Sequence, residues 1–234
     1  YPHTNFALDK GGEYLALIDS SGRIVHEYAP AFPAQQTDVS YGLWGDSFNY
    51  FPSPTPGRAN ERGVHGLTAP TEHSHGRGFY EEPFDLHILC DTSDATIRYT
   101  LDGSEPTEQY GIVYQRATPI RITTTTHVRS VAYKTGWQTP AVTTHSYIFV
   151  DDVAFQGQSP AGWPTDWGYD SEVGGIVPAD YEMDPRVVNG ALEGYSIRDV
   201  LLDIPTVSIS MPPDDFISDA TGIAHSTVGW VMAD

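Results

Sequence analysis

The side chains with the clearest capacity for chemistry are acidic residues in loops rich in glycine and proline. They are Asp102 and Glu105 in the turn L-D-G-S-E-P, the adjacent pair Asp151 and Asp152, and the adjacent pair Asp214 and Asp215. Oxygen-rich loops suit calcium, which makes these six residues candidate ligands and calcium the candidate ion. None of them completes an EF-hand pattern, and a bound ion would stiffen a loop rather than catalyse. The alternative for Asp102-Gly103 is a plain turn, because glycine accepts a positive φ.

The same acidic pairs are poor candidates for catalysis. A glycosidase holds two carboxylates across a cleft at a set separation, whereas adjacent residues on a strand point to opposite faces. The chain contains no G-x-S-x-G, H-E-x-x-H, P-loop or G-x-G-x-x-G motif. His73-Ser74-His75 places two imidazoles on one face of an extended segment, where they are either solvated or half of a zinc or copper site. We therefore expect a non-enzymatic protein.

Three tryptophans in loops are candidates for binding sugar rings by stacking. Trp137, Trp163 and Trp167 all lie in segments rich in glycine and proline. The alternative is that these rings fill the space between small domains, which have little core of their own. Carbohydrate binding, with a polysaccharide as partner, therefore remains open.

Composition limits the partners of the chain. The 234 residues carry a net charge of −19, with 31 acidic against 12 basic side chains. Such a surface repels nucleic acid and anionic membranes, and no apolar stretch approaches the roughly 20 residues of a membrane span. Cys90 is the only cysteine, so no internal disulfide forms, and its apolar surroundings indicate a buried, inert thiol.

Short alternating segments predict an all-β fold. Period-2 patterns mark strands at residues 13–18, 23–28, 96–101, 126–133 and 144–150, with further strands near 38–42 and 48–51. Near the C-terminus, Ser196 and Asp199 favour a capped short helix over 196–202, and alternation over 206–211 predicts another strand. Glycine and proline (22 and 18 residues) suit the many loops that this arrangement needs.

The central strands carry a family resemblance. A-T-I-R-Y-T-L-D-G-S-E-P-T, followed by V-R-S-V-A-Y-K-T-G and a closing Tyr147, resembles the chitobiase/β-hexosaminidase C-terminal module. The resemblance covers residues 78–150. It implies a small immunoglobulin-like β-sandwich, appended to other domains of an extracellular protein and without catalytic residues of its own.

The N-terminal 60 residues resemble a different module. H-T-N-F-A-L-D-K-G-G-E-Y-L-A-L-I-D, with P-T-P-G-R-A-N, is similar to the C-terminal half of a bacterial lamin-tail domain, another immunoglobulin-like sandwich. Half a sandwich leaves an apolar face uncovered and strand edges unpaired. Either the sequence is an excerpt of a longer protein, or another chain supplies the strands and builds a filament.

The C-terminal segment resembles the lead-in to a CotH-type domain, through I-P-T-V-S-I-S-M-P-P-D-D-F-I-S-D-A-T-G-I. The expected organisation is a partial lamin-tail-like sandwich at 1–60, a linker at 61–77, the chitobiase-like module at 78–150, and a loop-rich segment with one short helix at 151–234. This domain order resembles secreted, multi-domain bacterial surface proteins.

These patterns together favour tandem immunoglobulin-like β-sandwich modules in an extracellular or cell-surface protein. The expected role is a non-enzymatic scaffold, adhesion or filament module that binds other protein chains or copies of itself. The alternative is a carbohydrate-binding accessory region of a larger secreted enzyme or CotH-type protein. No nucleic-acid binding and no membrane insertion are expected.

Overall fold

The computed structural model describes residues 6–161, 163–170, 172–190, 194, 196–211, 215 and 216. The chain divides into two units, one formed by Tyr1–Thr68 with Tyr133–Thr139 and the other by Ala69–Ala132 with Pro140–Asp234. Strands in several small sheets dominate both units, and the helices of the described residues are short and lie in the second unit. The prediction of an all-β protein is confirmed.

The first unit contains two antiparallel hairpins. Strand β1 (Leu15–Ile18) pairs with β2 (Ile24–Tyr28), and β3 (Ser40–Trp44) pairs with β4 (Ser47–Phe51). The Asp19 carboxylate shapes the first turn, because it accepts hydrogen bonds from the backbone N–H groups of Ser21 and Arg23. Both hairpins fall where the alternating sequence predicts strands.

Aromatic rings give the first unit much of its interior. The Tyr28 ring lies 5.1 Å from Phe48 and 6.0 Å from Tyr41, measured between centroids. Phe32 and Phe51 are buried beside them. Within residues 61–77, Val64 forms a backbone bridge with Tyr50, so the segment is hydrogen-bonded at this end of the unit.

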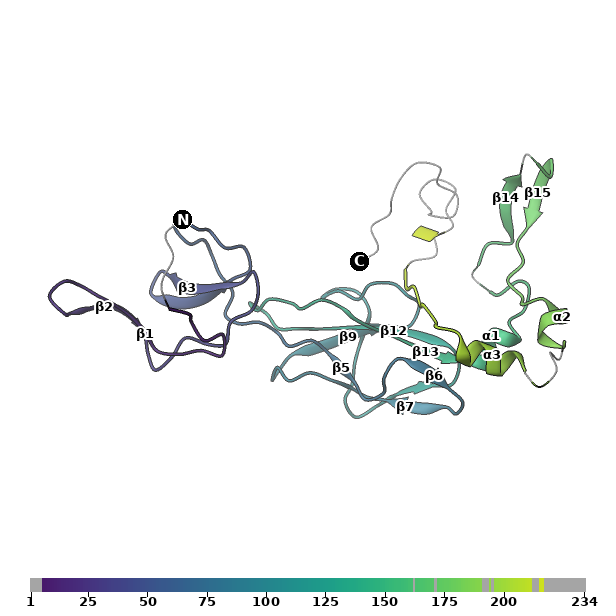
Figure 1. Cartoon of the computed structure of the whole chain (residues 1–234), viewed down its shortest axis with the longest axis horizontal. Helices are drawn as coiled ribbons and strands as arrows, with labels where there is room; N and C mark the ends of the chain where they lie inside the picture. Colours follow the sequence, from purple (N-terminus) through teal and green to yellow (C-terminus); the bar gives the residue numbers. More distant parts are fainter. Residues whose placement is uncertain are drawn as a thin grey trace. The chain divides into compact units, whose positions relative to one another are not determined.

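A β-sandwich is the main body of the second unit. Its larger sheet has the order β10-β9-β12-β13-β6, and Figure 1 shows β9, β12 and β13 side by side. The strands of this sheet are β6 (Gly78–Tyr80), β9 (Thr96–Thr100), β10 (Ile112–Val113), β12 (Thr126–Tyr133) and β13 (Thr143–Phe149). Strand β6 runs parallel to β13, while β12 and β13 are antiparallel.

Two smaller sheets face the larger one across the core. Strand β7 (Phe84–Leu86) pairs with β11 (Ile120–Ile122), and β5 (Glu72–His73) pairs with β8 (Ile88–Leu89). The buried core residues come from both sides: Leu86, Ile88, Ile97, Tyr114, Ile120, Ile122, Val128, Ala132, Tyr147 and Phe149. Because side chains alternate along a strand, Val128, Ser130 and Ala132 of β12 face this core.

In the described part of the segment after the sandwich there are three short helices and one hairpin. Helix α1 (Val150–Ala154) follows β13, and the hairpin of β14 (Asp166–Asp170) and β15 (Gly175–Pro178) comes next. Helix α3 (Ile197–Asp203) is the helix that the capping pattern predicts, and α1 and α2 (Pro185–Val188) are additional.

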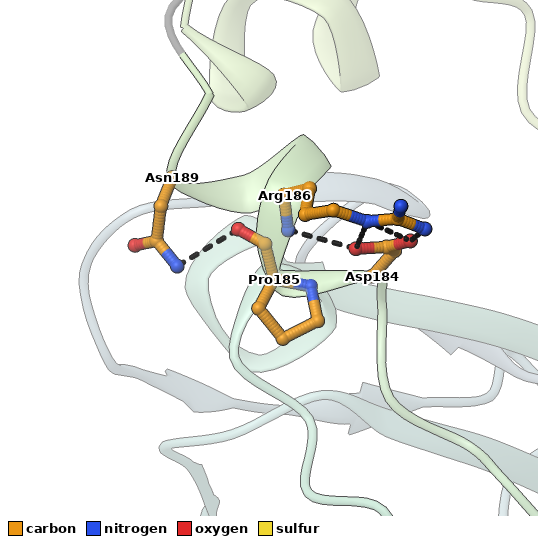
Figure 2. Close-up of polar contacts among 4 residues, drawn as sticks. All are labelled: Asp184, Pro185, Arg186 and Asn189. Carbon is orange, nitrogen blue, oxygen red and sulfur yellow. Dashed lines mark hydrogen bonds and ion pairs between the residues drawn. The ribbon is translucent and has the colours of Figure 1, made fainter.

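Helix α2 is short and fixed at both ends by side chains. Figure 2 shows the Asp184 carboxylate accepting a hydrogen bond from the Arg186 backbone N–H at 2.8 Å and pairing with the Arg186 guanidinium. At the other end, the Asn189 amide donates to the Pro185 carbonyl at 2.9 Å. These contacts cap a single turn that proline begins without losing a hydrogen bond.

The strand predicted over residues 206–211 is wrong, because the structure assigns no strand there. The alternation is real, with Ser208 contacting Ser146 of β13 while Val207 and Ile209 stay exposed. The segment crosses a sheet face instead of lying along an edge, so it has no partner for a hydrogen-bonded ladder. No helix within the described ranges is long and apolar enough to cross a membrane.

Candidate functional site

The Asp102 turn is a tight structural turn. Gly103 adopts a φ of 81°, and the Asp102 carboxylate accepts hydrogen bonds from the Ser104 backbone N–H and hydroxyl. Those bonds lower the pKa of Asp102, the Ser104 hydroxyl having the largest effect. Glu105 turns instead to Arg129, with 3.4 Å between carboxylate and guanidinium. Asp102-Gly103 therefore forms a turn in the structure, as the alternative interpretation predicts.

The other calcium candidates are engaged by different neighbours. Asp151 pairs with Arg198 of α3 at 2.7 Å, and Asp152 accepts a hydrogen bond from the Thr125 backbone N–H. Asp215 is described, whereas Asp214 lies outside the described residues. Among the residues that the structure describes, no three histidine, cysteine, aspartate or glutamate side chains gather closely enough to hold a metal ion. Calcium binding stays a prediction.

Two of the three candidate tryptophans come together. The rings of Trp163 and Trp167 (on β14) lie 5.5 and 4.9 Å from the Tyr181 ring. Trp163 is 43% exposed, so one face of this cluster is open to solvent. Trp137 belongs to the other unit, where the Lys134 ammonium sits 4.7 Å from the centre of its ring. The structure therefore groups Trp163 and Trp167 with Tyr181 and leaves Trp137 apart, and sugar binding stays a prediction.

A largely buried polar network, centred on the half-buried His73, joins β5, β12 and β13. One ring nitrogen of His73 lies 2.9 Å from the Tyr147 hydroxyl and the other lies 2.8 Å from the Ser130 hydroxyl. Ser130 also contacts the Thr71 hydroxyl at 2.7 Å, and Tyr147 donates to the His75 carbonyl at 3.1 Å. Both His73 nitrogens are thus already in hydrogen bonds. His75 stacks on Phe84, with ring centroids 4.2 Å apart.

Burial sets the charge state of this network. It lowers the pKa of His73 to about 4, and the neighbouring His145 contributes further in the same direction. It also lowers the pKa of His145 and raises the pKa of Tyr147. All three side chains are therefore neutral at pH 7. Ser130 and Tyr147 are fully buried, so this serine–histidine pair is not open to a substrate.

The sandwich containing this network has a counterpart among known families. Residues 75–144 match the family model of the Chitobiase/beta-hexosaminidase C-terminal domain. The match begins between β5 and β6 and ends in β13, so it takes in most of the larger sheet. No curated protein and no solved structure matches the chain.

This finding confirms one of the three resemblances drawn from the sequence. The chitobiase-type module, expected at 78–150, is found at 75–144 and is a β-sandwich as predicted. The lamin-tail and CotH-type resemblances, the expected domain boundaries and the six calcium ligands stay predictions. The sequence does not predict the network around His73. His73-Ser74-His75 is the only local pattern that points to it, because Ser130 and Tyr147 are distant from His73 in the sequence.

Proposed function

We propose that the chain is a non-enzymatic scaffold or adhesion region of a secreted protein, which joins other chains or copies of itself through its β-sandwich modules. The resemblance of residues 75–144 supports the non-enzymatic part, because it implies an appended module without catalytic residues. The sandwich interior supports it too, since His73 is half-buried and both of its ring nitrogens lie in hydrogen bonds to the buried Tyr147 and Ser130.

The observation that carries the proposal is the apolar surface of the β1–β2 hairpin. Leu17, Ile18, Ile24 and Val25 are 48–63% exposed. Neighbouring residues on a strand point to opposite faces, so both faces of this hairpin present apolar side chains. A two-stranded hairpin is marginal in water on its own and gains stability when further strands or a packed partner cover it. The hairpin therefore suits assembly through added strands.

Sedimentation of the purified chain across a wide concentration range tests this role. We expect reversible, concentration-dependent association that Leu17→Ser or Val25→Ser weakens. Val173→Ser is the matched control, because Val173 is similarly exposed but lies outside this hairpin. A parent chain that stays monomeric at every concentration would overturn the proposal, as would equal weakening by the control.

The cluster of Trp163, Trp167 and Tyr181 favours a second candidate function, carbohydrate binding as an accessory region. An exposed aromatic ring next to two others can stack on a sugar ring. Affinity electrophoresis in chitin-type and mucin-type polymers tests it. Trp163→Ala should abolish any retardation that Trp44→Ala leaves intact, since the two rings are almost equally exposed. Retardation that neither substitution changes would exclude the cluster.

A further inference from the structure

The outer face of the larger sheet carries a groove of about 800 Å³. Strands β6, β12 and β13 form its floor, and residues 206–210 form a wall held by a 2.5 Å contact between the Ser208 and Ser146 hydroxyl oxygens. The volume is that of a typical site for a small ligand.

Arg129 lines this groove, and its hydrogen bonding is incomplete. Its side chain is only 9% exposed. The two terminal nitrogens donate to the Gly103 carbonyl at 3.1 Å and to the Glu105 carboxylate at 3.4 Å. The Nε atom is buried and finds no acceptor among the described residues, and neither does the buried Ser210 hydroxyl. Unsatisfied buried donors are costly, so a ligand oxygen reaching them would be stabilised.

The groove also differs in charge from the rest of the molecule. The chain carries a net charge of −19, yet the described residues that line the groove include two arginines and no acidic side chain. Arg77 is exposed at the groove while Arg129 is buried within it. The exposed Arg77 guanidinium can donate two parallel hydrogen bonds to a carboxylate. Arg129 adds its Nε donor, because Gly103 and Glu105 already accept from its terminal nitrogens.

The remaining lining fits a sugar. Thr144, Thr206 and Ser210 add hydroxyl groups to the lining, while the Ser146 and Ser208 hydroxyls contact each other. A hydroxyl group can donate and accept, as the hydroxyl groups of a sugar require. Phe79 and Ile148 offer apolar surface to the C–H face of a ring. We propose that this groove binds a carboxylate-bearing sugar, such as a uronic acid unit of an acidic polysaccharide. The inference goes beyond the scaffold role and uses a site separate from the tryptophan cluster.

Calorimetric titration of the full chain with short galacturonate oligomers tests the proposal. Their methyl esters are the matched ligand control, because esterification removes the charge and leaves the ring hydroxyls. We expect the acid to bind and the ester to bind at least about tenfold more weakly, since charge-assisted hydrogen bonds to guanidinium are lost. Acetate tests the carboxylate without the sugar ring, and we expect it not to compete with galacturonate at equal carboxylate concentration.

Variants locate the binding. Arg77→Gln should weaken galacturonate binding by about tenfold. Arg129→Lys should weaken it further, because lysine lacks the Nε–H group that is left unpartnered in Arg129. Arg121→Gln is the control, since Arg121 pairs with Asp85 between β7 and β11. Trp163→Ala should leave galacturonate binding unchanged.

Three results would overturn the proposal: no binding of the acid, equal binding of acid and ester, or wild-type binding by Arg77→Gln. Competition by acetate would overturn the sugar part. The exposed position of Arg77 makes its variant the decisive one if Arg129→Lys fails to fold. Self-association by the β1–β2 hairpin is measured without any sugar, so the failure of one proposal does not entail failure of the other.

Discussion

The His73 imidazole and the Tyr147 hydroxyl lie 2.9 Å apart inside the sandwich, joining the short strand β5 to the long strand β13. The second ring nitrogen of His73 contacts Ser130 of β12 at 2.8 Å. His145 lies beside the pair, with its ring centroid 4.5 Å from that of His73. The histidine therefore connects three strands while remaining uncharged, and this arrangement makes the stability of the module depend on pH.

We predict that acid destabilises the sandwich between pH 6.5 and about 4. The pKa of His73 is lowered to about 4 in the folded chain, so over this window the unfolded chain binds a proton that the folded chain does not. The stabilisation that comes from His73 is fully present above the pKa of this residue in the unfolded chain. It is lost as the pH falls, by at most about 3 kcal/mol. The lowered pKa values of His145 and His127 act in the same direction.

Urea denaturation at a series of pH values measures this loss. His73→Gln should flatten the acid slope while lowering stability at pH 7, because glutamine does not titrate and fits the two hydrogen bonds poorly. His87→Gln is the control, as His87 is exposed on the same module. An unchanged slope in His73→Gln would show that other groups cause the acid sensitivity.

Tyr147→Phe isolates the hydroxyl group of the same network. Tyr147 is fully buried, and its hydroxyl donates to the His75 carbonyl as well as contacting His73. Removing it takes away the partner of one His73 ring nitrogen and one of the two donors to the His75 carbonyl, the other being His145. We expect a loss of about 1–3 kcal/mol in the free energy of unfolding. Tyr169→Phe is the control, because Tyr169 is 72% exposed. A neutral Tyr147→Phe would mean that the network reorganises without cost.

The sequence predicts the strands of this network but not the network itself. Period-2 alternation marks residues 96–101 and 126–133, and the structure places β9 and β12 there, because alternation reflects one buried face. The contacts of His73 instead join residues 57 and 74 positions apart. Such pairing depends on strand order, and a single sequence without covariation contains no direct signal for it.

The tryptophan cluster and residues 206–211 show the same limit. Trp163 and Trp167 meet Tyr181 only through the folding of a loop-rich segment, so sequence reasoning names two members and misses the third. Alternation over 206–211 indicates that one face of the segment packs against protein. It does not distinguish a strand in a hydrogen-bonded ladder from an extended segment that crosses the face of a sheet. Arg129 was not predicted as a site residue, because alternation places it on a strand without showing what covers that face.

Gly66 is predicted to be intolerant of any side chain. A Cβ atom at this position would lie 2.6 Å from carbon atoms of the Trp137 ring, so the ring would have to shift from its place beside Lys134. We expect Gly66→Ala to cost about 1–3 kcal/mol of stability, as overpacking in an interior does. Gly76→Ala is the matched control, because nothing lies within 4 Å of its added Cβ. Equal denaturation midpoints for the two variants would contradict the close approach of Trp137.

Helix α3 is predicted to depend on its capping box. The Ser196 hydroxyl accepts a hydrogen bond from the Asp199 backbone N–H at 3.2 Å, and the Asp199 carboxylate accepts one from the Ser196 backbone N–H at 2.9 Å. Ser196→Ala removes the first of these bonds from a helix of only seven residues. We expect the equilibrium for local opening of α3 to rise by about fivefold, the usual effect of losing an N-cap.

Amide hydrogen exchange measures this opening directly. The amides of Val200 and Ile204 should exchange faster in Ser196→Ala, because both bond to carbonyls within or at the start of the helix. Ser196→Thr should restore protection, since threonine also caps helices. The amides of β12 should not change, because Arg198 connects α3 to Asp151 and Glu81 at the surface rather than to the core. Faster exchange throughout β12 would show instead that α3 is part of the cooperative sandwich.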